Sequence, residues 1–221
     1  MYSFLTVWQN QPIIRVRKGR YLFNFFINIS AGVGGKCSME GKRLTSYAME
    51  ELECPKCGHK HSLKKYKVIN VTEKAKLKEE IMKNRLYQFS CEECEYMAPL
   101  TYDSLYVDSQ RNIMIYMAPV MNAEIKAEIA ELEQEKGIDK RLVDNINDLK
   151  EKIMIADNHL DDRVIEIIKI MYIDQMKKEM EDDTLLNILF DYNRDNYCFL
   201  VFFQKKGIGK IPLTREFYRQ V

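Results

Sequence analysis

Two pairs of cysteines, each separated by two residues, constrain this chain more than any other feature. They lie in the stretches ECPKCGHK and SCEECEY and are Cys54, Cys57, Cys91 and Cys94. A C-x-x-C turn lets two thiolates converge on one metal ion, and two such turns supply the tetrahedral set of sulfurs that Zn²⁺ prefers. Pro55 presets the first turn, and Gly58 tolerates the positive φ that comes after the second sulfur. The sequence therefore predicts a structural Zn²⁺ site.

The spacing of the two pairs differs from that of a compact zinc finger. The gap covers residues 58–90, whereas about 15–20 residues are usual. Such a gap has room for a strand and a helix, so we expect the metal to join the two ends of an inserted β-α element. The second pair also lacks proline and glycine, and Glu92, Glu93 and Glu95 place carboxylates beside sulfurs that are net negative around Zn²⁺.

Other interpretations of the cysteines remain open at this point. Another metal ion, a redox dithiol and unligated core cysteines are the alternatives to zinc. His59 or His61 could replace a cysteine ligand, although we expect both to be polar residues on the rim of the site. Cys198 lies in an apolar stretch and is expected to be a small buried hydrophobic residue.

The first half of the chain reads as strands with one helical insert. Val, Ile and Tyr alternate imperfectly after the first cysteine pair, and two β-rich runs flank a polar turn further on. Thr72 is expected to cap the insert helix, with Leu77 and Ile81 facing inward. The predicted elements are a strand into the first pair, a strand over 62–71, a helix over 73–84, a strand–turn–strand unit over 86–102 and a hairpin over 104–119.

The second half of the chain reads as three helices and then strands. Asn122 is expected to cap a helix that stops at Gly137. The next helix is expected over 141–160, with its apolar stripe beginning at Leu142, and the third over 161–180 is apolar nearly all round. The remaining predicted elements are strands over 185–192 and 196–207 and a short helix after Pro212.

Charge and hydropathy limit the classes of protein. The net charge is +1, which gives no general case for binding nucleic acid or a membrane. No apolar run reaches the roughly 18 residues of a membrane span. A secreted disulfide scaffold would be shorter and richer in cysteine, so we expect a cytoplasmic protein.

Residues 1–48 differ from the rest, with seven Lys and Arg side chains against one Glu and no sustained period. We expect residues 1–38 to be a leader or a poorly ordered tail, and an N-terminal strand is the alternative. The predicted fold is α+β: an N-terminal extension over 1–48, a zinc-ribbon-like β unit with a helical insert over 49–120, and an α+β region over 121–221.

Two segments around the cysteine pairs carry further motifs. ELECPKCGHKHSLKKYKVINV holds the first pair, and the segment that holds the second runs on to Tyr106-Val107-Asp108 and Met114-Ile115-Tyr116. In these motifs the stretch 49–119 resembles the CpXC-domain family of bacterial proteins. The segment NDLKEKIMIADNHLDDRVIEIIK is similar to the region C-terminal to the domain in longer members. The resemblance implies zinc binding at the four cysteines and implies no activity. The chain departs from the family pattern at Glu92, where proline is expected.

Two further groups of charged residues are candidate sites. Asp161, Asp162 and Glu166 could form a metal-dependent active site, but acids in the first turn of a helix are the favoured interpretation. The basic segment 60–85 could contact single-stranded nucleic acid, and a solvated strand and helix is favoured instead. Its candidate contacts are Lys60, Lys64, Lys65 and Lys67.

The most favoured function is therefore a zinc-held binding or scaffold protein with a protein partner of unknown identity. No catalytic residue is assigned, and a non-enzymatic protein is favoured over an enzyme.

Overall fold

A computed structural model describes residues 43–179, 183–193 and 196–221 of the chain. The predictions made for residues 1–38 lie outside these ranges. The fold of the described residues is α+β, as predicted, with a five-stranded, a three-stranded and a two-stranded sheet. The proposed domain limits at 48 and 120 stay predictions.

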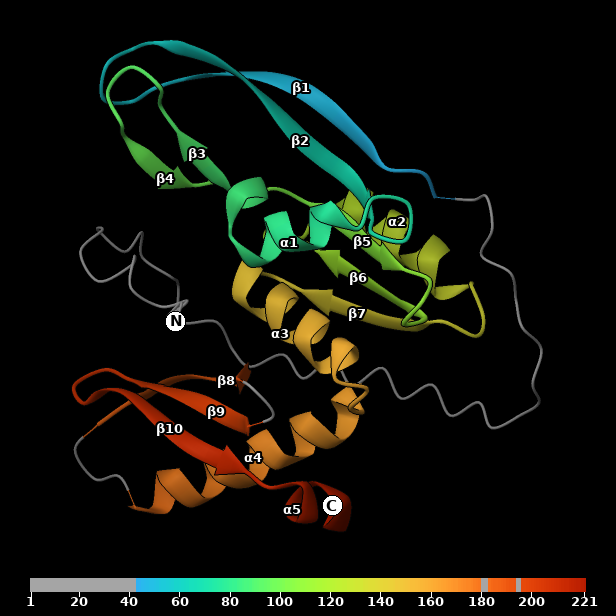
Figure 1. Cartoon of the computed structure of the whole chain (residues 1–221), viewed down its shortest axis with the longest axis vertical. Helices are drawn as coiled ribbons and strands as arrows, with labels where there is room; N and C mark the ends of the chain where they lie inside the picture. Colours follow the sequence, from blue (N-terminus) through green and yellow to red (C-terminus); the bar gives the residue numbers. More distant parts are fainter. Residues whose placement is uncertain (1–42, 180–182, 194–195) are drawn as a thin grey trace. The chain divides into compact units, whose positions relative to one another are not determined.

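The five-stranded sheet has the order β1-β2-β5-β6-β7 (Figure 1). Neighbouring strands are antiparallel in β1–β2 and β5–β6 and parallel in β2–β5 and β6–β7. The strands are β1 (Ser46–Glu53), β2 (Lys60–Asn70), β5 (Ser104–Asp108), β6 (Ile113–Met117) and β7 (Asp139–Val143).

The hairpin of β5 and β6 forms the centre of this sheet, and all ten of its strand residues are buried. One face packs against α2 (Ala123–Glu133) through Ile125 and Leu132. The other face packs against α1 (Lys76–Met82) and α3 (Ile146–Asp157). Burial on both faces explains why these strands are apolar without alternation.

The hairpin of β1 and β2 is anchored to the sheet only at its base. Residues Val68–Asn70 of β2 pair with β5, while residues 47–53 and 60–66 pair only with each other. We call residues 47–66 the β1–β2 arm. The first cysteine pair is the turn at its tip. The second pair is the turn between the short strands β3 (Gln88–Ser90) and β4 (Met97–Pro99), which come after the 3₁₀ helix η1 (Arg85–Tyr87).

The C-terminal elements form a separate apolar cluster. The strand order is β10-β9-β8. The elements are α4 (Asp162–Glu179), β8 (Leu185–Asn193), β9 (Asn196–Phe203), β10 (Gly207–Leu213) and α5 (Arg215–Gln220). Phe190 and Phe199 are fully buried against Ile165 and Ile168 of α4, and Ile155 of α3 joins them. Hydrophobic burial thus connects α3 to both halves of the described chain.

Several expected details are wrong. Thr72 does not cap a helix: α1 begins at Lys76, and the Thr72 hydroxyl accepts the Ser109 N–H at 2.8 Å. Leu142 does not begin a helical stripe, since it lies in β7, which extends the sheet beside β6. Strand β10 was not predicted. Helix α4 is covered by the C-terminal strands and by Ile155 of α3, while Ile167 and Met171 on its outer side are 39% and 47% exposed.

Asp108 closes the central hairpin and connects it to α1. Its buried carboxylate accepts the N–H groups of Gln110 and Arg111 at 3.1 and 3.2 Å. The same carboxylate lies 3.0 Å from Lys78 Nζ and accepts the Tyr106 hydroxyl at 3.3 Å. Both oxygens of the buried group are therefore used, as a charge in a protein interior requires.

Helix α3 allows a first test of the fold. The side chain of its N-cap, Asn145, accepts the Asp148 N–H at 2.9 Å. We expect Asn145→Ala to lower the free energy of unfolding by about 1 kcal/mol, because this N–H loses its partner. Asn147→Ala, on an exposed position of the same helix, should leave the urea midpoint unchanged or raise it. Equal midpoints for the two variants would contradict the assigned cap.

Candidate metal centre

The first cysteine turn is closed by backbone hydrogen bonds. The Cys54 N–H donates to the His59 carbonyl at 2.8 Å, and the Gly58 N–H donates to the Cys54 carbonyl at 2.8 Å. Gly58 has φ of 73°, the left-handed conformation that glycine adopts without steric cost. The turn therefore fits the ECPKCG sequence as expected.

The second cysteine turn repeats the first with a different residue at the strained position. The Cys91 N–H donates to the Tyr96 carbonyl at 2.8 Å, and the Glu95 N–H donates to the Cys91 carbonyl at 3.0 Å. Glu95 occupies the place of Gly58 and has φ of 57°. A left-handed non-glycine residue costs about 1–2 kcal/mol, so this turn is held against its local preference.

The two turns bring the four cysteine sulfurs together. All four Sγ atoms lie within 4.8 Å of one another. The Cys54–Cys94 and Cys57–Cys91 sulfur pairs are both 3.6 Å apart, so the short distances cross from one turn to the other. Sulfurs bound at about 2.3 Å to one tetrahedral ion would lie about 3.8 Å apart. The cluster can therefore hold one metal ion.

The surroundings of the cluster are partly apolar and partly polar. Cys54 and Cys91 are buried with Phe89, and Leu63 and Tyr96 pack beside them. Cys57 is exposed. The Lys56 ammonium donates to the Cys94 carbonyl at 3.3 Å and so links the turns.

The turn also affects the acidity of Cys54. Burial opposes ionisation of this thiol, but the N–H groups of Cys57 and Lys56 and the neighbouring thiols together lower its pKa to about 7. At Cys57 the His59 N–H favours the thiolate, but burial and the contacts with the other thiols outweigh it and raise the pKa to about 12, so the cluster favours one thiolate among the four sulfurs when no cation is bound.

His61 contributes to the wall of the cluster. Its Nε2 atom lies 3.2 Å from Cys91 Sγ, and its ring meets Phe89 edge-on with centroids 5.3 Å apart. His59 is exposed and packs against the His61 ring. Sequence reasoning placed both histidines on the rim and missed the sulfur contact of His61. The alternation along β2 was the available signal, because it puts His61 on the same side as Leu63.

The four lysines named as candidate nucleic-acid contacts lie along β2. Lys65 pairs with Glu50 at 2.5 Å, and the Lys64 ammonium sits 4.9 Å from the centre of the Tyr47 ring. Lys60 lies opposite Glu53 in the register, and Lys67 is exposed. The lysines are thus interspersed with acidic residues of β1.

The three acidic candidates near the start of α4 do not converge on one site. Asp161 pairs with Arg163 at 2.5 Å on the surface. Asp162 is buried and accepts the Lys152 ammonium at 2.7 Å and the Arg141 guanidinium. Glu166 pairs with Lys152 and, at 3.1 Å, with Lys169.

Asp162 and Glu166 belong to a charge-balanced network between β7, α3 and α4. Lys169 contacts Glu151 at 2.9 Å, and Glu151 in turn accepts the Phe190 N–H at 2.5 Å. Burial raises the pKa of Glu151. Burial also opposes ionisation of Asp162, but Lys152 and Arg141 outweigh it and hold the pKa of Asp162 below its usual range. The members are Arg141, Glu151, Lys152, Asp162, Glu166 and Lys169.

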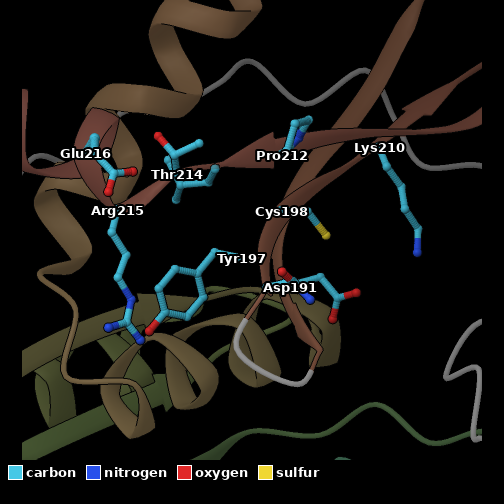
Figure 2. A pocket seen from close by; sticks show the side chains of 10 residues that line it. Asp191, Tyr197, Cys198, Lys210, Pro212, Thr214, Arg215 and Glu216 are labelled. Atoms are coloured by element: carbon cyan, nitrogen blue, oxygen red, sulfur yellow. The ribbon is translucent and has the colours of Figure 1, made fainter.

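Cys198 lines an open pocket beside the C-terminal strands (Figure 2). It is partly exposed, not buried as expected. Burial and the neighbouring Asp191 raise the pKa of its thiol, which makes it a weak nucleophile. The Arg215 guanidinium lies 5.7 Å from the centre of the Tyr197 ring at the same pocket.

In the part of the chain that the structure describes, no helix is long and apolar enough to cross a membrane.

Comparison with protein families identifies the chain. The family model described as CpXC protein matches residues 52–169, more than half of the 221 residues. The chain belongs to the CpXC family. The matched range extends beyond the stretch 49–119 on which the sequence resemblance rested, and it includes β7, α3 and the first part of α4. No curated protein and no solved structure matches the chain.

The two turns of this CpXC protein generate a paired test of backbone strain. Glu95→Gly should raise the free energy of unfolding by about 1 kcal/mol, because glycine tolerates the left-handed backbone. Gly58→Ala should lower it by about 1–2 kcal/mol, and this loss reflects φ alone because a Cβ there meets its nearest atom at an ordinary 3.5 Å. Urea denaturation measures both. Glu95→Ala is the control, because it removes the charge and keeps a side chain at the left-handed position. If it raises the free energy of unfolding as much as Glu95→Gly does, the strain argument is wrong.

The buried network generates a test of stability against pH. Asp162→Asn should lower the free energy of unfolding by about 3–5 kcal/mol, because it removes a buried carboxylate that pairs with Lys152 and Arg141. Since the folded pKa of Asp162 lies below its unfolded value of about 3.9, the pairing stabilises the fold above that pH and is lost as the pH falls through the folded pKa. The variant should therefore lose less stability than the wild type between about pH 5 and pH 2.

Asp161→Asn is the matched control for this test, because its pair with Arg163 is exposed. The Asp161 side chain also accepts the Arg163 N–H at 2.9 Å before α4 begins, and an asparagine oxygen can accept it equally well. A cost below about 1 kcal/mol for Asp162→Asn would show that the network does not stabilise the fold.

Proposed function

We propose that Cys54, Cys57, Cys91 and Cys94 bind one structural Zn²⁺ ion. On this proposal the protein is a binding or scaffold protein in which the metal fixes the β1–β2 arm. The observation that carries the proposal is the meeting of four sulfurs from two turns that are remote in sequence. Soft thiolates in a tetrahedral set favour zinc over the harder divalent ions.

The small apolar cluster beneath the sulfurs supports a structural role for the metal. Only Cys54, Phe89 and Cys91 among the described residues are fully buried there. A two-stranded hairpin alone is at best marginally stable in water, and most of the β1–β2 arm has no third strand among the described residues. Metal coordination therefore supplies free energy that the local apolar contacts lack.

Four protein ligands also argue against metal catalysis at this centre. A catalytic zinc ion keeps one position for water or substrate, whereas a four-cysteine set fills the tetrahedron. Because such thiolates persist in a reducing compartment, we place the protein in the cytoplasm. The partner we propose is another protein.

The two other candidate functions have less support. A nucleic-acid contact through Lys60, Lys64, Lys65 and Lys67 would have to accommodate the carboxylates of Glu50 and Glu53 among them. A metal-dependent enzyme at Asp161, Asp162 and Glu166 would have to break the buried pairs of Asp162.

Metal analysis of the purified protein tests the proposal. We expect one equivalent of zinc, lost in both Cys54→Ser and Cys91→Ser, because each variant removes a buried ligand. Hydrogen exchange should then quicken in β1–β4, while β5 and β6 keep their protection because their contacts lie in other apolar clusters. Cys198→Ser is the matched control and should retain the metal.

Three results would count against a structural zinc site: folded protein without metal, iron in place of zinc, or loss of zinc with unchanged exchange in the arm.

A further inference from the structure

Strand β1 lies at the edge of the five-stranded sheet that the described residues form. Within the described ranges it pairs with β2 and with no second strand (Figure 1). Seven of its eight residues are exposed, and Leu52 alone is partly covered. An edge strand presents unpaired backbone N–H and C=O groups that a further strand can complete.

One face of β1 carries exposed apolar side chains. Residues alternate between the faces of a strand, so Tyr47 and Met49 share a face. They are 48% and 56% exposed. The register places Tyr66 and Lys64 opposite them on β2, and the Lys64 ammonium over the Tyr47 ring confirms that these groups lie on one face. Apolar side chains of this size beside an open backbone edge favour a bound strand over free solvent.

The end of β1 next to the cysteines is acidic. Glu51 and Glu53 come after Met49 on the same face and form no ion pair with any described residue. The second cysteine turn adds exposed Glu92, Glu93 and Glu95, and it lies beside the end of β1 because the Cys54 and Cys94 sulfurs are 3.6 Å apart. Four thiolates around Zn²⁺ would carry a further net charge of about −2.

Lys56, Lys60 and Lys64 offset only part of this charge. The edge is therefore apolar at one end and acidic at the other.

We propose that the free edge of β1 is the docking strand for an extended, basic segment of a partner protein. The partner segment adds a strand beside β1, with its aliphatic side chains next to Tyr47 and Met49 and its lysine or arginine side chains next to Glu51 and Glu53. The inference rests on the proposed function, because the metal holds the arm and adds to the charge at its tip. It names the chemistry of the partner that the proposed function leaves open.

The same features disfavour two other occupants, a second copy of the chain and a nucleic acid. A second copy pairing antiparallel would place each acidic half of β1 beside the apolar half of its mate, without a cation for any carboxylate. A nucleic acid would meet the acidic end with its own phosphates, which like-charge repulsion opposes.

The test uses the full chain with its metal and a labelled peptide of about ten residues, enough to pair along the eight residues of β1. The peptide alternates valine and threonine in one half and lysine and threonine in the other. Fluorescence anisotropy at low salt gives the affinity, and hydrogen exchange locates the contact. We expect saturable binding that weakens with salt, with new protection in β1.

Two probe controls and one variant pair sharpen the test. Two versions of the peptide carry N-methyl groups on alternate backbone nitrogens, one version for each edge of the peptide strand. The version methylated on the edge that faces β1 should not bind. The combined variant Glu51→Lys and Glu53→Lys should weaken binding about tenfold or more, because two attractive contacts become repulsive. The matched control, Glu131→Lys and Glu133→Lys on exposed positions of α2, changes the net charge equally and should leave the affinity unchanged.

Several results would overturn the docking strand. They are equal binding of both methylated peptides, wild-type affinity in the Glu51/Glu53 variant, or self-association that protects β1. Displacement of the peptide by oligothymidine, lost in Lys60→Glu, would assign the arm to nucleic acid instead.

Metal content measured on the same samples separates the two proposals. If protein purified without metal binds the peptide, the zinc proposal is wrong and the docking strand stands. If zinc-loaded protein does not bind the peptide, the docking strand is wrong and the zinc proposal stands.

Discussion

The convergence of four sulfurs from two hairpin turns is the contact on which the β1–β2 arm depends. One turn ends a hairpin that reaches beyond its sheet, and the other ends a pair of three-residue strands. Among the described residues, neither hairpin has an apolar core of its own beyond the few side chains around Phe89. Each turn therefore needs the other, and the residues between them form the insert that the spacing predicted.

The same backbone turn is built twice from different residues. Gly58 makes the first turn at low cost, whereas Glu95 is held in a left-handed conformation. The contrast indicates that contacts across the cluster, rather than local preference, fix the second turn. His61 belongs to these contacts, because its ring lies against both Phe89 and the sulfur of Cys91.

The cysteine cluster, the α+β class and the family were predictable because their signals are local or strictly periodic. The C-x-x-C spacing selects a turn, and Asn122 caps α2 as its sequence position indicates.

The errors share a cause, since each depended on a tertiary partner. The spacing of Leu142 fits the apolar stripe of a helix, yet Leu142 lies in β7 because this segment pairs with the edge of β6. The sequence places Thr72 before a helix that it could cap, but in the fold its hydroxyl accepts the Ser109 N–H instead. Asp162 was correctly recognised as an acid in the first turn of a helix, but Lys152, which pairs with both Asp162 and Glu166, comes from α3 and could not be found from the spacing.

The position of the two cysteine turns has a consequence for biosynthesis. Cys54 and Cys57 leave the ribosome ahead of Cys91 and Cys94 by the length of the insert, a delay of a few seconds at ordinary elongation rates. Strand β5, which anchors the base of the arm, emerges later still. The nascent chain therefore carries half of the four-sulfur cluster before the other half exists. During that interval the thiols of Cys54 and Cys57 are open to oxidation before the chain has folded.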